Sequence, residues 1–323
     1  MTSRLLSQRL ESLRGFHSIL VPVDQSPLAE QAISVALAIA ERARSKIKLV
    51  HVHRELRPLF ELEPSQDYVE LRLAMRKSGR EYLRTLTRHL QQRMGRAASS
   101  VMLTGPVAPT LATYVKDLRA DLVVMTSHGY GGLRRIWLGS VADELVRTVE
   151  VPVLLVRPAE NENPDPASFR RIMVPLDGSP LAEEILAPAL LLGRLWSAEL
   201  NLLQIVHPLP YAAGAVPKPL RSTAHYNPLV SRELEIARAY LEGIAGSLRD
   251  QQVTASSRAV VGASVAETLV DSAHQEGAGL IALATHGRSG VRRLVLGSVA
   301  DKLLRATELP VLVYRPRRRR KRS

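Results

Sequence analysis

An internal repeat divides this chain into two similar halves. The segment Leu138–Asp143 (Leu-Gly-Ser-Val-Ala-Asp) recurs as Leu296–Asp301, and the two copies lie 158 positions apart (297 − 139 = 158). An earlier motif, Val-Pro-Val-Asp-Gln-Ser-Pro-Leu-Ala-Glu around Asp24, returns around Asp177 as Val-Pro-Leu-Asp-Gly-Ser-Pro-Leu-Ala-Glu, at an offset of 153 (177 − 24 = 153). A chain of 323 residues is long enough for two ordinary domains. The repeat therefore predicts one domain that occurs twice.

Each half alternates short β-rich runs with longer helical patterns. This alternation is typical of an α/β fold, in which a parallel sheet is covered by helices on both faces. In the first half we expect strands at 17–23, 47–52, 99–103, 122–125 and 153–156, and in the second half at 172–176, 200–206, 256–260, 280–283 and 311–314. The sequence thus predicts two open, five-stranded parallel sheets in tandem.

The segments outside these patterns suggest the domain boundaries. We expect domains at 16–157 and 169–316, joined by a polar, proline-rich linker at 158–168. Residues 1–15 resemble a short amphipathic helix, and residues 317–323 form a basic tail. A Pro-, Ala- and Gly-rich loop from 207 to 228 is interpreted as a variable insertion, with a mobile lid as the alternative.

Composition restricts the class of protein. No apolar run approaches the roughly 20 residues that a membrane helix needs, and residues 1–15 lack the apolar stretch of a secretory signal. Because the chain has no cysteine, disulfides and thiolate chemistry are excluded, and we expect a cytoplasmic protein. Of the formal net charge of +13, seven charges lie in the run from Arg315 to Arg322. This tail is either a solvated, self-repelling segment or a weak contact for polyanions, made through Arg317–Arg322.

Acidic residues and glycine loops converge on one edge of each predicted sheet. Asp24 and Asp177 follow the first strand of their halves, and a glycine loop follows each fourth strand. Ligands of open parallel sheets bind outside the carboxyl ends of the strands, where the strand order reverses. If the first and fourth strands are neighbours, each aspartate and its glycine loop face the same crevice.

The loops have the chemistry of a phosphate site. Gly129 and Gly287 permit positive φ angles and leave backbone N–H groups uncovered. The pairs Gly139-Ser140 and Gly297-Ser298 open the following helix, whose positive end attracts anions. The serine hydroxyls are interpreted first as helix caps and second as phosphate donors. Arginines inside the loops either offset phosphate charge or lie on a solvated face; they are Arg134, Arg135, Arg292 and Arg293.

These motifs make each half similar to a universal stress protein domain. The ATP-binding members of that family carry a glycine, two residues, a second glycine, nine residues, and then glycine followed by serine or threonine. The second glycine of this pattern falls on Gly129 and Gly287, and its last pair falls on Gly139-Ser140 and Gly297-Ser298. The resemblance spans nearly all of both halves and implies two tandem Rossmann-like domains.

The resemblance also implies the residues of two nucleotide sites. The family's strand-one aspartate, which contacts the nucleotide near its ribose and base, falls on Asp24 and Asp177, and a strand-two residue that contacts adenine falls on Ile47 and Leu200. The full expected set is Asp24, Ile47, Met125, Thr126, His128, Gly129, Gly139, Ser140 and Val141, with Asp177, Leu200, Leu283, Ala284, His286, Gly287, Gly297, Ser298 and Val299.

One position departs from the family pattern. The first motif glycine is replaced by Thr126 and by Ala284. Alanine adds little volume, whereas threonine adds a branched side chain where a nucleotide would approach the backbone. The second half therefore fits a nucleotide better than the first.

The resemblance implies a protein that binds ATP, or ADP or AMP, with Mg²⁺ carried by the nucleotide, and that acts as a conformational or partner switch. An efficient enzyme is not expected, because there is no Gly-x-x-x-x-Gly-Lys-Ser/Thr loop and no dinucleotide fingerprint. No cluster of His, Asp or Glu suggests a metal site held by protein alone. The alternatives are a nucleotide-independent basic adaptor and a slow ATP hydrolase. In the family the fifth strands commonly pair two domains, so 153–156 and 311–313 are expected to pair within the chain, or in a homodimer.

Overall fold

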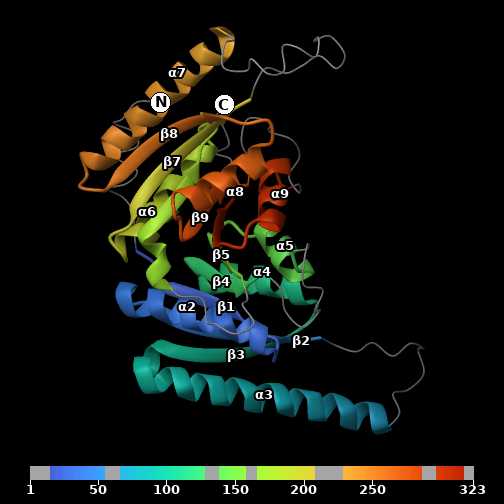
Figure 1. The fold of residues 1–323 in the computed structure, drawn as a ribbon. Helices are drawn as coiled ribbons and strands as arrows, with labels where there is room; N and C mark the ends of the chain where they lie inside the picture. Colours follow the sequence, from blue (N-terminus) through green and yellow to red (C-terminus); the bar gives the residue numbers. More distant parts are fainter. Residues whose placement is uncertain are drawn as a thin grey trace, which may run out of the picture. The chain divides into compact units, whose positions relative to one another are not determined.

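The computed structural model describes residues 15–54, 66–127, 138–157, 166–207, 228–285 and 296–315. These residues form two compact units, which divide between Pro166 and Ala167 (Figure 1). The amphipathic segment, most of the linker, most of the loop after His207 and the basic tail lie outside the described residues. In the part of the chain that is described, no helix is long and apolar enough to cross a membrane.

The first unit contains a parallel sheet in the order β3-β2-β1-β4-β5. The fold predicted for this half is confirmed, and each strand ends within a residue or two of its expected bounds. The strands are β1 (Ser18–Pro22), β2 (Lys46–His53), β3 (Ala98–Thr104), β4 (Leu122–Thr126) and β5 (Val153–Val156).

Helices cover this sheet, and their ends follow local signals. Helix α2 begins after Ser26, whose Oγ accepts the N–H of Ala29, and Pro27 occupies its first turn. Arg44 ends it in a left-handed conformation (φ 55°). The helical elements are α2 (Pro27–Ala43), α3 (Gln66–Met94), the 3₁₀ turn η1 (Gly95–Ala97), α4 (Val107–Leu118) and α5 (Ser140–Thr148).

The second unit repeats the topology, with the parallel order β8-β7-β6-β9-β10. Its strands are β6 (Arg171–Pro175), β7 (Glu199–Val206), β8 (Ala255–Val261), β9 (Leu280–Ala284) and β10 (Val311–Tyr314). Its helical elements are η2 (Pro166–Arg170), η3 (Ala182–Ile185), α6 (Leu186–Arg194), α7 (Pro228–Arg249), α8 (Val265–Gln275) and α9 (Ser298–Ala306).

One helix differs between the repeats for a clear reason. In place of the long α2, the second unit has a 3₁₀ turn followed by the short α6. Pro188 lies where the first half has Val35 (188 − 153 = 35). Because proline has no N–H to donate to the preceding turn, it is tolerated only near a helix start. The helix accordingly begins two residues before Pro188.

The order of the strands in each sheet determines where a ligand-binding crevice can form. In each unit the second and third strands lie on one side of the first strand, and the fourth and fifth strands lie on its other side. The strand order therefore reverses between β1 and β4 and between β6 and β9. The central strands are buried along most of their length, and Leu122, Val123 and Val124 of β4 have 0% exposed surface. Helices on both faces explain these continuous apolar runs. Loops that leave the carboxyl ends of the central strands are therefore where a ligand site is expected.

Candidate functional site

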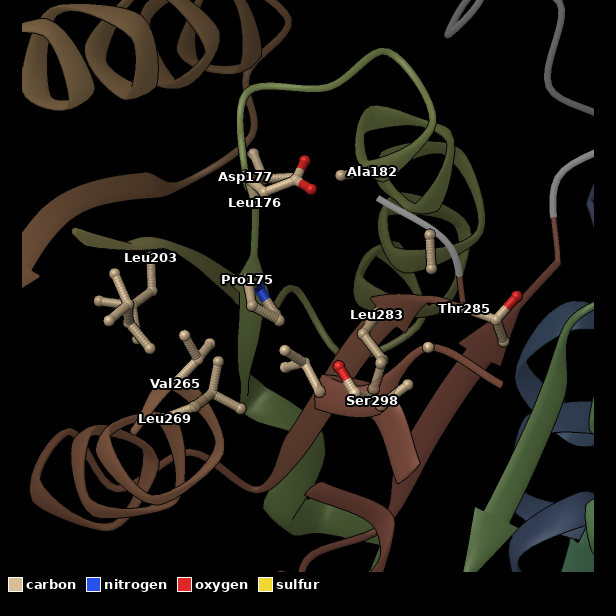
Figure 2. Close-up of a pocket in the computed structure, with 15 residues that line it drawn as sticks. Pro175, Leu176, Asp177, Ala182, Leu203, Val265, Leu269, Leu283, Thr285 and Ser298 are labelled. Carbon is tan, nitrogen blue, oxygen red and sulfur yellow. The ribbon is translucent and has the colours of Figure 1, made fainter. Parts of the chain in front are cut away.

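A cavity of about 300 Å³ opens at the carboxyl ends of β6, β7 and β9 in the second unit (Figure 2). Six residues of the set expected from the sequence line this cavity: Asp177, Leu283, Ala284, Gly297, Ser298 and Val299. The cavity is lined by the turn after β6, the carboxyl ends of the strands, one face of α8 and the amino-terminal turn of α9. Its size lies at the lower end of the range of small-molecule sites.

A tight turn fixes the carboxylate at the cavity. Asp177 Oδ1 accepts the N–H of Ser179 at 2.9 Å, and Ser179 Oγ accepts the N–H of Ala182 at 3.1 Å. Gly178 has a positive φ of 79° in this turn, and Gln25 has φ 68° at the equivalent position of the first half. The first half repeats the arrangement, because Asp24 Oδ1 accepts the N–H and Oγ–H of Ser26 at 3.0 and 2.6 Å. Both aspartates are therefore held in place by their own backbone.

The amino terminus of α9 supplies hydrogen-bond donors to the cavity. Gly297 is the helix N-cap, and the first intrahelical bond runs from Asp301 N–H to Gly297 C=O at 2.9 Å. The N–H groups of Ser298, Val299 and Ala300 thus have no acceptor within the helix, and all three residues line the cavity. Such a helix end attracts an anion.

The structure corrects the first interpretation of the two serines. Gly139 and Gly297 occupy the N-cap position, so Ser140 and Ser298 are the first residues inside their helices. Among the described residues, neither hydroxyl is seen to make a hydrogen bond. The serines therefore do not occupy the N-cap position, and their role as phosphate donors stays a prediction.

Apolar side chains form the opposite wall. Leu203 and Ile205 of β7 and Val265 and Leu269 of α8 line the cavity, and Figure 2 shows Leu203, Val265 and Leu269 gathered on one side of it. Val299 adds an apolar surface that is 40% exposed. A flat, weakly polar ring fits such a wall because its faces gain dispersion contacts.

The strand-two prediction is misplaced by five positions. Leu200 is fully buried near the start of β7, paired with Ile172 and Ala255, and does not line the cavity. Ile47 is likewise fully buried at the second residue of β2. Only residues near the carboxyl end of a parallel strand reach the crevice, and in β7 these are Leu203 and Ile205.

Other cavity residues were absent from the expected set. Ile205 is the second-to-last residue of β7, and Val265 is the first residue of α8. The repeat places Val52 and Val107 at the equivalent positions of the first half (205 − 153 = 52 and 265 − 158 = 107). A location near the carboxyl end of its strand is the signal that could have found Ile205.

In the first unit, Val107, Ser140 and Val141 line a cavity of about 580 Å³ with Arg54. Three of these positions match Val265, Ser298 and Val299 in the other half. The cavity does not include Asp24, Met125 or Thr126. Met125 and Thr126 are buried at the end of β4, and Gly139 N–H donates to Ser127 C=O at 2.8 Å. The loop residues His128, Gly129, His286 and Gly287 and the four loop arginines lie outside the described residues.

A tyrosine lies beside the acidic turn in each unit. Burial raises the pKa of Tyr82, and the negative charges of Glu30 and Asp24 raise it further. Tyr240 donates a hydrogen bond to Glu183 Oε1 at 3.0 Å. Glu30 and Glu183 are equivalent (183 − 30 = 153). The raised pKa keeps the Tyr82 phenol neutral next to these two carboxylates.

Comparison with known protein families shows which family this chain belongs to. The family model described as "Universal stress protein family" matches twice, over residues 15–157 and 168–315. The chain belongs to the universal stress protein family. The resemblance inferred from the glycine motif is therefore confirmed, and it holds for both halves.

Individual relatives agree. The chain is 32% identical over 217 residues to a universal stress protein of Mycobacterium tuberculosis, an alignment covering 67% of this chain and 68% of the relative. It is 27% identical over 307 residues to one from Mycolicibacterium smegmatis, covering 93% and 98%. Among solved structures, a universal stress protein from Archaeoglobus fulgidus superposes with a TM-score of 0.65 at 16% identity, covering 93% and 96%. At this low sequence identity, the structural similarity shows that the two proteins share a fold.

Proposed function

We propose that this universal stress protein binds one adenine nucleotide in each half and uses nucleotide occupancy to bias its conformation or choice of partner. The observation that carries the proposal is the cavity of the second unit, where an apolar wall, a fixed carboxylate and a helix amino terminus surround about 300 Å³. These three chemistries complement the base, the ribose and the phosphates of a nucleotide.

Each part of the ligand has a proposed contact. The base lies against Ile205 and Leu269, and the ribose hydroxyls donate to Asp177. The phosphates accept hydrogen bonds from the backbone of α9 and from the Ser298 hydroxyl. Adenine, rather than another base, is supported by the glycine spacing that the chain shares with ATP-binding family members. Mg²⁺ is proposed to arrive with the phosphates; among the described residues no group of three or more His, Asp or Glu could hold it.

A binding role is proposed in preference to catalysis. Asp177 is the single ionisable side chain among the described residues that line the cavity, and it is assigned to the sugar. None of these residues is then left to activate water at a terminal phosphate. Slow hydrolysis remains the second candidate. A cytoplasmic location, pairing of the fifth strands and a polyanion contact by Arg317–Arg322 are part of the same proposal.

The proposal is tested by titrating adenosine, AMP and ATP calorimetrically against matched variants. Asp177→Asn removes a charged acceptor, so adenosine and ATP should both weaken by roughly 1.5–3 kcal/mol. Ser298→Ala removes a neutral donor, so ATP should weaken by roughly 0.5–1.5 kcal/mol while adenosine is unaffected. Asp24→Asn and Ser140→Ala make the same test in the first half.

Two results would contradict the proposal. One is a folded protein, free of carried-over nucleotide, that gives no heat with any of the three ligands. The other is tight binding that neither aspartate variant changes, which would move the nucleotide away from the strand edge. Equal loss of adenosine and ATP in Ser298→Ala would mean that α9 does not face the phosphates.

A further inference from the structure

Helix α3 of the first unit carries a row of exposed cations. Its 29 residues include seven Lys and Arg against three Asp and Glu, a net charge of +4 (7 − 3). Four of the cations recur every fourth residue, and Lys77 follows the first of them directly. We call the five residues Arg76, Lys77, Arg80, Arg84 and Arg88 the α3 cationic stripe. At about 100° per residue these five positions fall within roughly 120° of the helix circumference.

The stripe lies beside the face that the helix buries. Gly79, Leu83 and Leu90 are buried, and α3 packs along β2 and the edge strand β3 (Figure 1). Lys77, Arg80, Arg84 and Arg88 are exposed. Leu73, Glu81 and four of the cations shape a groove of about 370 Å³. The stripe thus forms a continuous, accessible surface.

Few acids neutralise this surface. Glu81 is 4.0 Å from Lys77, with both side chains more than half exposed, so this pair is weak. Within the part of the chain that the structure describes, no carboxylate pairs with Arg80, Arg84 or Arg88. The neighbouring edge strand, Ala-Ser-Ser-Val-Met-Leu-Thr, contributes no charge.

The repeat supplies an internal control. Helix α7 occupies the same place in the second unit and packs along β7 and β8. It carries three arginines and three glutamates, a net charge of zero (3 − 3). The fold therefore does not require a cationic helix at this position, and the stripe is specific to the first unit.

We propose that the α3 cationic stripe binds the phosphate backbone of nucleic acid, without reading its sequence. From Arg76 to Arg88 the stripe runs 12 residues, about 18 Å at 1.5 Å per residue. Duplex DNA presents one charge per roughly 1.7 Å of axis, so several phosphates lie within this span. Guanidinium groups match phosphate oxygens in pairs. None of the stripe's residues lines the strand-edge cavity of either unit.

A membrane surface fits the helix less well. Insertion needs one continuous apolar face. The apolar side chains exposed on α3 are Val69, Leu71, Leu73 and Met75. Each is two residues from the next, about 200° around the helix, so they lie on different sides. Further along the helix, Leu83 and Leu90 are buried and Leu86 is half-buried.

The test uses the full chain and a fluorescently labelled DNA duplex of arbitrary sequence, with anisotropy measured over a series of salt concentrations. The triple variant Arg80→Gln, Arg84→Gln, Arg88→Gln is compared with Arg194→Gln, Arg232→Gln, Arg238→Gln, which removes three exposed charges from the second unit. At about 0.9 per phosphate contact, the slope of log K against log salt should fall by roughly two to three in the α3 variant. Affinity should weaken at least tenfold, while the control slope changes by less than about one.

Equal losses in the two triple variants would overturn the proposal, because net charge alone would then explain binding. Unchanged DNA affinity and salt slope in the α3 triple variant would overturn it, and DNA binding would then be assigned to the basic tail. Loss of binding to vesicles of anionic lipid, with duplex binding retained, would assign the stripe to a membrane instead. The single variant Arg84→Gln, with an expected slope change of about 0.9, replaces the triple variant if the latter fails to fold.

Discussion

Gly297 provides a test of why the motif keeps its glycine. Its N–H donates to Thr285 C=O at 3.1 Å, and a Cβ added at Gly297 would lie 2.7 Å from that same oxygen. Its φ of −55° is open to any residue, so the glycine is needed for space and not for backbone freedom. A methyl group would push the base of the loop apart and weaken this hydrogen bond.

Overpacking of this kind costs typically about 1–3 kcal/mol. Taking about 2 kcal/mol, the transition of the second unit should move down by roughly 4–8 °C. We expect this for Gly297→Ala in thermal unfolding followed by circular dichroism, without nucleotide. The matched control is Gly243→Ala in the exposed part of α7, where a Cβ meets nothing within 4 Å. That variant should be stabilised by up to about 1 kcal/mol.

A Gly297→Ala protein as stable as the parent would refute the steric argument. If the argument holds, lost nucleotide binding in a Gly297 variant cannot by itself show a phosphate contact, because the loop would already be displaced. Ser298→Ala and Asp177→Asn are then the informative variants.

Three further predictions concern the crevice. Ala284→Thr should weaken ATP binding in the second half by about 1–3 kcal/mol, measured by calorimetry. Thr126→Ala should leave the ATP affinity of the first half unchanged or increase it. Unchanged ATP affinity in the Ala284→Thr protein would show that this position does not approach the ligand. Ile205→Ala should weaken ATP binding by roughly 1–2 kcal/mol, while Leu200→Ala should lower stability by about 2–5 kcal/mol and leave affinity unchanged; the reverse pattern would restore the strand-two assignment. Because the pKa of Tyr82 is raised in the folded protein, the stability due to its neutral phenol is present below about pH 10 and is lost as pH rises above that value. Tyr82→Phe should therefore reduce the loss of stability in alkali, and a phenolate spectrum of Tyr82 that appears near pH 10 in the folded state would contradict this.

The fold was predictable because its signals are local and occur twice. The apolar run Leu122 to Thr126 and the capped start of α2 at Ser26 each specify their element without reference to distant residues. Pro188 is also visible in the sequence. Its effect, a 3₁₀ turn in place of the first helical turns, becomes clear only by comparison with α2 in the first half.

The site was less predictable than the fold because it depends on how far along each strand a residue lies. Leu200 and Ile205 belong to the same apolar strand, but Leu200 lies near its start, whereas Ile205 lies near its carboxyl end and lines the cavity. The serine assignment depended on a single residue of helix start, since Gly297 instead of Ser298 occupies the N-cap. Sequence pattern locates a helix start to within a residue or two, which does not resolve that difference.

The central claim is that both strand-edge crevices hold a nucleotide. The most direct measurement is calorimetric titration of ATP into the nucleotide-free protein, repeated with Asp24→Asn, with Asp177→Asn and with both. We predict two ATP per chain, one lost or strongly weakened in each single variant and both in the double variant. A folded wild-type chain that binds no ATP, or that keeps both sites in the double variant, would contradict the account.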